Sequence, residues 1–167
     1  MAGPLILTAE LAPEDFAWLD ALRRHHFPPE RNQLSAHLTM FHALPPFAEG
    51  EARQALASLS TEPAPRAFIS SVINLGGGVA FRIASDELDQ MRAYIADRFH
   101  GLLTTQDAGG WSAHVTIQNK VSPRVARALI DALGTAYDRR PVRISGLGLH
   151  RYLGGPWETL RVYPFRG

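Results

Sequence analysis

A short polar motif occurs twice in the chain, and the same kinds of element follow each copy. Residues 35–39 read SAHLT and residues 112–116 read SAHVT, so the two histidines stand 77 positions apart. In both copies a proline lies nine residues after the histidine, Pro46 or Pro123, and a helical pattern follows it. A strand, turn and helix that recur in this way predict a duplicated fold with two lobes.

The other segments mix strand and helix patterns without the regular alternation of a parallel sheet. Apolar, β-rich runs at residues 66–75 and 79–84 flank three glycines, which indicates a hairpin. A second hairpin is predicted between residues 142–152 and 157–165, around the turn LGGP. Because hairpins pair their strands antiparallel, the sequence predicts the α+β class.

Composition and net charge restrict the domain count, the kinds of ligand and the chemistry that this chain can have. At 167 residues the chain fits one domain, residues 1–167, with the 46% hydrophobic and 20% charged residues of a globular protein. A net charge of +1 predicts that any contact with nucleic acid is confined to a terminus or a single nucleotide. The absence of cysteine excludes disulfides, thiolate nucleophiles and cysteine-bound zinc. With neither a signal peptide nor a membrane-spanning run in the sequence, we expect a cytoplasmic protein.

The repeated motif also carries the most reactive side chains. On a strand, residues two apart share one face, so His37 projects with Thr39, and His114 with Thr116. A neutral imidazole can accept a proton while a charged one donates, and threonine hydroxyls can hold phosphoryl oxygens. Two such pairs facing a groove suit phosphoester cleavage. No carboxylates cluster near the motifs, and the adjacent His25 and His26 of a predicted helix point in different directions. We therefore expect no metal and no cofactor.

The paired H-[LV]-T-[MI] motifs resemble those of the 2H phosphoesterase superfamily, in particular its 2′-5′ RNA ligase-like, cyclic phosphodiesterase branch. The order of elements is similar over nearly the whole chain. The resemblance implies a bilobal, pseudo-symmetric fold with two antiparallel β-sheets lining a central groove and helices packed outside. It also implies metal-independent opening of 2′,3′-cyclic phosphates to 2′-phosphates, or action on 2′-5′ linkages.

The resemblance carries residue roles with it. His37 and His114 match the catalytic positions, and Thr39 and Thr116 match those that bind the substrate phosphate. By the same resemblance His114 is the base that activates water and His37 the acid that protonates the leaving oxygen, an order that strand geometry alone leaves open. Many members have proline before each histidine, where this chain has Ala36 and Ala113. RNA-acting members are often more basic, which favours small nucleotides here.

Four further residues are candidate nucleotide contacts. By strand alternation Phe41 shares the face of His37 and could stack on a base, with core packing as the equal alternative. Gln118 shares the face of His114 and could bond a nucleotide edge or a phosphate. Tyr152 and Trp157 flank a glycine turn and could line the groove, although strand packing is the stronger interpretation. Arg82 lies in a strand and could pair with phosphate, but such arginines more often face solvent.

Two functions from different classes remain open. One is the cyclic phosphodiesterase, and the other is a catalytically silent module that binds nucleotides or RNA ends in the same groove. A serine hydrolase is excluded, because Ser35 and Ser112 each lie two residues before a histidine on an extended strand and no G-x-S-x-G turn exists. The expected partner is a small nucleotide or an RNA terminus bearing a cyclic phosphate. We expect no membrane contact, no obligate protein partner and a monomer.

Overall fold

The structure is a computed structural model that describes residues 2–167, which form seven strands and five α-helices in mixed order. The strands are β1 (Leu5–Leu11), β2 (Leu38–Leu44), β3 (Arg66–Asn74), β4 (Val79–Ala84), β5 (His114–Gln118), β6 (Pro141–Tyr152) and β7 (Trp157–Pro164). The helices are α1 (Pro13–His26), α2 (Glu49–Leu59), α3 (Asp86–Arg98), α4 (Thr105–Ala108) and α5 (Pro123–Leu133), with 3₁₀ turns at Pro29–Arg31 and Pro46–Ala48. The α+β class and both predicted hairpins are confirmed.

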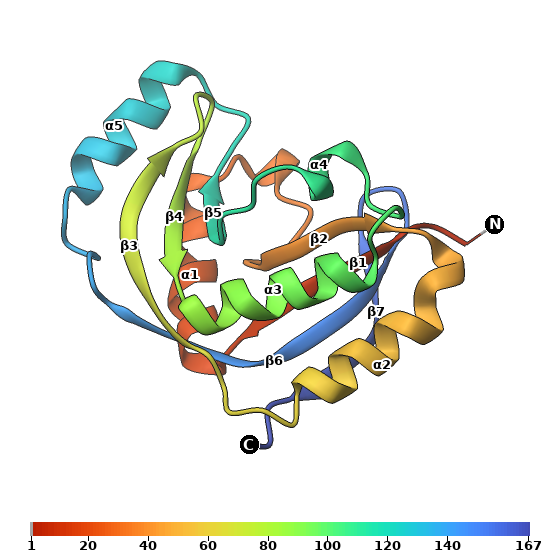
Figure 1. The fold of residues 1–167 in the computed structure, drawn as a ribbon. Coiled ribbons are helices and arrows are strands. Elements are labelled where there is room, and N and C mark those ends of the chain that lie inside the picture. The colour runs from red at the N-terminus through yellow and green to blue at the C-terminus, as the bar shows by residue number, and fades with distance from the viewer. Residues whose placement is uncertain (1) are drawn as a thin grey trace.

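The strands form one curved antiparallel sheet, in the order β2-β1-β6-β3-β4-β5, with β7 paired to β6 beside this path (Figure 1). Strand β6 joins the two halves, because residues 141–143 pair with β3 and the rest of the strand pairs with β1 and β7. The two expected sheets are therefore halves of one sheet that share this long strand. Its curvature brings β2 and β5, the edge strands at the two ends of this order, into contact.

Helices pack on both halves of this sheet. Helix α1 contacts β5, α3 and α5 contact β3, α2 contacts β6, and α4 contacts β2 (Figure 1). Two of the helices begin at serine caps, where Ser85 and Ser122 accept a hydrogen bond from the third residue of the helix that follows. Within the part of the chain that the structure describes, no helix has both the length and the apolar character needed to cross a membrane.

Each motif strand carries one extra residue directly after its threonine. On β2, Thr39 pairs with Thr8 and Phe41 with Leu7, which leaves Met40 unpaired between them. On β5, Thr116 pairs with Ala80 and Gln118 with Val79, which leaves Ile117 in the same position. Such a bulge breaks the alternation of side chains between the two faces of a strand. The two lobes therefore repeat a backbone irregularity as well as a motif.

The bulges overturn the predicted orientation of two candidate residues. Phe41 is fully buried in the core, where the Arg92 guanidinium lies 4.1 Å from the centre of its ring. Gln118 is 3% exposed, and its Oε1 has no hydrogen-bond partner among the described residues. Neither side chain faces the groove, because the extra residue turns the strand before it. The prediction that they share a face with the histidines is wrong.

Side chains from the opposite lobe cover the free edges of both motif strands. Arg23 on α1 donates from Nη1 to the main-chain oxygen of Thr116 at 3.0 Å. Arg92 on α3 donates from Nε to the main-chain oxygen of Met40 at 3.1 Å, and Trp111 Nε1 donates to that of Thr39 at 3.2 Å. Unpaired carbonyls on an edge strand invite pairing with another chain, and these bonds satisfy them instead. The same bonds fix each motif relative to the other.

Candidate active site

The two histidines hold the same position and the same hydrogen bond in their lobes. His37 directly precedes β2, and His114 is the first residue of β5. The Nδ1 of His37 lies 2.8 Å from the main-chain oxygen of Ser35, and the Nδ1 of His114 lies 2.9 Å from that of Ser112. Because a carbonyl oxygen only accepts, Nδ1 carries the proton in both rings. Each neutral ring therefore keeps a lone pair on Nε2, away from the strand.

Ala36 and Ala113, which directly precede the two histidines, are both buried. The N–H of Ala36 donates to Asp20 Oδ1 at 2.9 Å, a bond that a proline could not make. The main-chain oxygen of Ala113 accepts from the N–H of Ile83 at 2.8 Å. Hydrogen bonds thus anchor the backbone before each histidine.

His37 is the electrostatically unusual member of the pair. Its pKa is lowered to about 4: burial is the largest cause, the positive charges of Arg23, His114 and His150 act in the same direction, and the hydrogen bond with the Ser35 carbonyl opposes them. At neutral pH the His37 ring is therefore uncharged, and Nε2 can accept a proton. His114 acts on His37 through its charge, which places both imidazoles in one electrostatic environment.

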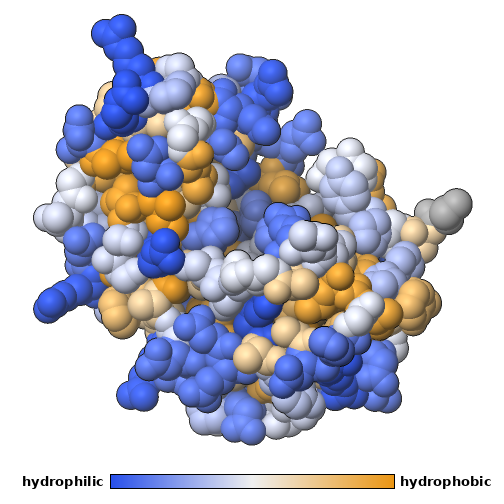
Figure 2. Space-filling model, turned by 45° about the horizontal axis from the view of Figure 1, so that its top comes forward, coloured by the Kyte–Doolittle hydropathy of each residue, from blue (hydrophilic) through white to orange (hydrophobic). Residues whose placement is uncertain are grey.

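Thr39 and Thr116 remain partly exposed beside their histidines. They precede the bulges, so the alternation that pairs each with its histidine is intact. The structure thus gathers the four motif side chains on two edge strands that contact each other. The face shown in Figure 2 is hollowed between the two halves, with hydrophilic residues on both sides of the hollow.

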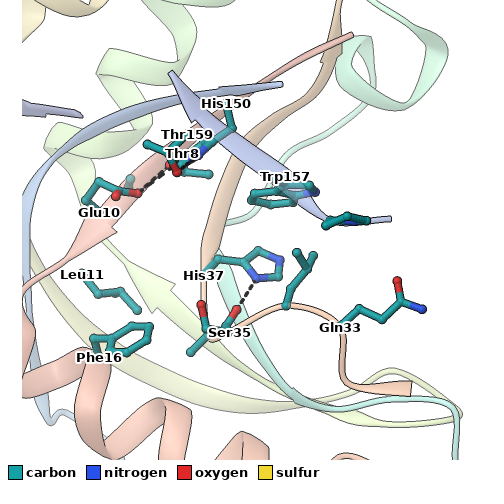
Figure 3. A pocket seen from close by; sticks show the side chains of 14 residues that line it. Thr8, Glu10, Leu11, Phe16, Gln33, Ser35, His37, His150, Trp157 and Thr159 are labelled. Carbon is teal, nitrogen blue, oxygen red and sulfur yellow. Dashed lines mark hydrogen bonds and ion pairs between the residues drawn. The ribbon is translucent and has the colours of Figure 1, made fainter. Parts of the chain in front are cut away.

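A cavity of about 350 Å³ opens beside His37 (Figure 3). The Trp157 indole stands at its edge, with its ring centre 4.8 Å from that of His37 and 5.4 Å from that of His150. Leu11, Phe16, Leu34 and Pro156 supply further apolar walls. Tyr152, the other aromatic candidate, is 40% exposed and does not line this cavity. Of the two aromatic side chains near the glycine turn, the structure brings only Trp157 to the site.

Four polar strand residues of the cavity, Thr8, Glu10, His150 and Thr159, escaped the sequence analysis, as did Gln33 in the loop before the first motif. The four strand residues lie on β1, β6 and β7, whose registers place them on one face of the sheet. A signal was present, since Thr8 and Glu10 alternate within an apolar strand and His150 interrupts another. Buried polar side chains at such positions need hydrogen-bond partners, and only the folded chain shows that these residues bond one another.

Arg82 lies directly opposite His114 in the pairing of β4 with β5, so the two side chains share a face. Its Nη1 donates to the hydroxyl of Ser112. Arg82 is exposed to solvent, as such arginines usually are, and stands beside the second motif. Residues 2–167 contain no group of three or more His, Asp or Glu side chains placed to hold a metal ion.

The α+β fold, with its antiparallel sheet and two contacting strands that each carry a His-x-Thr motif, is the fold of the 2H phosphoesterases. The family model of the 2′-5′ RNA ligase superfamily matches residues 11–156, and the chain belongs to that superfamily of phosphoesterases. No curated protein matches the chain.

Solved structures agree with this assignment at the level of the fold. The protein TT0787 of Thermus thermophilus is similar over 98% of both chains, with a TM-score of 0.65 and 15% identity. Escherichia coli LigT in complex with 3′-AMP is similar over 100% of both chains, with a TM-score of 0.59 and 16% identity. LigT in complex with NADP⁺ gives a TM-score of 0.58 at 15% identity over 99% of both chains.

Proposed function

We propose that the protein is a metal-independent phosphodiesterase that opens 2′,3′-cyclic phosphates of RNA ends or small nucleotides to 2′-phosphates, and that also acts on 2′-5′ linkages. The observation that carries the proposal is the matched state of the two imidazoles, whose Nδ1 atoms both donate to a carbonyl two residues earlier. A main-chain bond of this kind fixes the tautomer and the ring orientation, which acid–base catalysis requires.

The reaction needs one base and one acid. One Nε2 takes a proton from water, whose oxygen attacks the phosphorus, and the other gives a proton to the 3′ oxygen as its bond to phosphorus breaks. The phosphate stays on the 2′ oxygen. The hydroxyls of Thr39 and Thr116 donate to the non-bridging oxygens, where negative charge gathers. Each proton transfer contributes on the order of 10²–10⁴-fold to the rate.

The order of the roles is the one that the resemblance implies, and charge is compatible with it. The resemblance gives the acid role to His37, whose pKa of about 4, lowered first by burial, leaves it neutral in the free protein. A phosphodiester carries a negative charge, and an opposite charge within a few ångströms favours the imidazolium form. Substrate binding therefore charges His37, and His114 serves as the base.

A nucleotide suits the groove on two grounds. LigT, which shares the fold, forms complexes with 3′-AMP and with NADP⁺. The exposed guanidinium of Arg82 stands beside His114 and adds a phosphate-binding cation to the second motif. The net charge of +1 over the whole chain favours small nucleotides over long RNA.

The second candidate is a binding module that uses the same groove without turnover. One observation favours it: the pKa of His37, lowered by burial to about 4, leaves the free protein without a charged imidazole at that position at neutral pH. In such a module the two histidines would act as phosphate ligands.

Turnover in the presence of EDTA separates the two candidates. The protein is incubated with each 2′,3′-cyclic mononucleotide in EDTA, and ³¹P NMR distinguishes 2′- from 3′-phosphate products. We expect a single 2′-phosphate product, and loss of turnover in His37→Ala and in His114→Ala. His42→Ala is the matched control, because its exposed ring bonds Asp107 and does not line the cavity beside His37. Binding without turnover would establish the module, and EDTA-sensitive turnover would overturn the metal-independent mechanism.

A further inference from the structure

The cavity beside His37 contains a hydrogen-bonded chain in which every proton can be placed. Thr8 Oγ1 donates to Glu10 Oε2 at 2.7 Å, so this hydroxyl has no proton left for His150, whose Nε2 lies 2.8 Å away. His150 therefore carries its proton on Nε2 and donates to Thr8. Thr159 lies 3.0 Å from Nδ1 of the same ring, which accepts from its hydroxyl while the ring is neutral. The chain runs from Thr159 through His150 and Thr8 and ends on Glu10 (Figure 3).

The chain makes Glu10 a fixed acceptor that faces the cavity. Burial alone raises the pKa of Glu10, but the interaction with His150, whose Nε2 lies 3.8 Å from Oε2, and the hydrogen bond from Thr8 outweigh it and hold that pKa below its usual value. The carboxylate is therefore charged at neutral pH. Among the described residues its Oε1 takes part in no hydrogen bond, and Oε2 keeps a second lone pair beyond the one that Thr8 uses. A ligand in the cavity meets an anion with two acceptor positions.

A second cavity, of about 280 Å³, has the opposite charge. Arg23, Arg31 and Lys120 line it, and it shares Gln33 and Leu34 with the cavity of Glu10. A phosphate is repelled by Glu10 and attracted by this basic cavity. The part of a substrate that enters the Glu10 cavity is therefore not a further phosphate but a neutral group that donates hydrogen bonds.

We propose that the Glu10 cavity binds the nucleobase of the substrate and selects guanine, whose N1–H and N2–H donate to the Glu10 carboxylate while the ring packs on Trp157. Guanine is the nucleobase with two adjacent donors on one edge. Adenine and cytosine place a ring acceptor beside their amino group, and uracil places its one N–H between two carbonyls. A carboxylate accepts at both oxygens and so matches the guanine edge alone. The volume of 350 Å³ lies in the range of small-molecule pockets.

The inference rests on the proposed function for the position of the phosphate at His37, and base selectivity tests it. We expect kcat/KM for guanosine 2′,3′-cyclic phosphate to exceed that for the uridine analogue by roughly 10- to 100-fold, as charged hydrogen bonds allow. The amide of Glu10→Gln offers one donor and one acceptor, which match the ring acceptor and amino group of adenine and cytosine. In this variant the preference for guanine should therefore fall at least about tenfold and shift toward these two bases. Glu158→Gln, an exposed residue next to Trp157 but outside the cavity, should keep the wild-type order.

Binding of the four nucleoside 2′-monophosphates, measured by calorimetry, separates this inference from the hydrolase. Guanine-selective binding without turnover would support the proposed base selectivity of the cavity and reject the proposed phosphodiesterase activity. Turnover with equal kcat/KM for all four bases, or equal binding of all four products, would overturn the proposal of a guanine-selective cavity but not the proposal of a phosphodiesterase. The wild-type series decides the matter even where Glu10→Gln fails to fold.

Discussion

Arg23 and Thr116, which are 93 residues apart in the chain, are joined by a hydrogen bond of 3.0 Å from the guanidinium Nη1 to the main-chain oxygen. The same guanidinium donates through Nε to Asn32 Oδ1 at 2.8 Å and lies 4.4 Å from the centre of the Phe27 ring. A helix of the first lobe thus holds the strand that carries the second histidine. The approach of the two motifs depends on this buried arginine.

Replacement of Arg23 by methionine should destabilise the protein far more than the same change at an exposed position of the same helix. The Thr116 oxygen and Asn32 Oδ1 would both lose a donor, at a cost of about 2–4 kcal/mol in the free energy of unfolding. Urea unfolding measures the change. Arg24→Met, at the next position with a 68% exposed side chain, should change stability by no more than about 0.5 kcal/mol. Equal effects at the two positions would contradict the role of Arg23.

The titration of His37 should be shifted far to the acid side. We expect its NMR pKa near 4 in the free protein, because burial and neighbouring positive charges disfavour the imidazolium form, and an upward shift when inorganic phosphate is added. Between pH of about 6.5 and 4, His37 is protonated in the unfolded chain but not in the folded chain. The free energy of unfolding should therefore decrease as pH drops through this range. His37→Gln should flatten that fall. An ordinary pKa for His37 would contradict this account.

Trp157 should contribute to the low pKa of His37. Its ring centre lies 4.8 Å from that of the imidazole and shields it from water. In Trp157→Ala the pKa of His37 should rise toward its usual value, because burial is the first cause of the shift. Tyr152→Ala, on the same hairpin but outside the cavity, provides the control and should leave the pKa of His37 in place. The same NMR titration measures both variants.

Two glycine substitutions should have effects of opposite sign. A Cβ at position 148 would lie 2.5 Å from Thr8 Oγ1 and 2.7 Å from His150 Nε2, so Gly148→Ala should cost about 1–3 kcal/mol and displace the chain that ends on Glu10. Gly50 lies in α2 with nothing within 4 Å of an added Cβ, and Gly50→Ala should stabilise by about 0.5–1 kcal/mol. Thermal unfolding compares the two. A stabilising Gly148→Ala would contradict the close packing of Thr8 and His150 against this glycine.

Much of the fold could be predicted because its signals are local. The glycines between β3 and β4, the serine caps of α3 and α5, and the alternation that joins each histidine to its threonine all act over a few residues. The motif residues His37, Thr39, His114 and Thr116 could be named for the same reason. Their chemical roles remain predictions for the experiments above.

The sequence by itself determined which segments are strands or helices, since these follow from periodicity and turn composition, and it singled out the motif residues by their repetition. Only the tertiary structure decided where Phe41 and Gln118 point, because the bulges at Met40 and Ile117 exist only in register with a partner strand. The assembly of Glu10 with His150 was likewise decided by folding, since strands 140 residues apart in the chain become neighbours only when the sheet forms. Side-chain periodicity is a property of one strand, whereas register and burial are properties of the strands beside it.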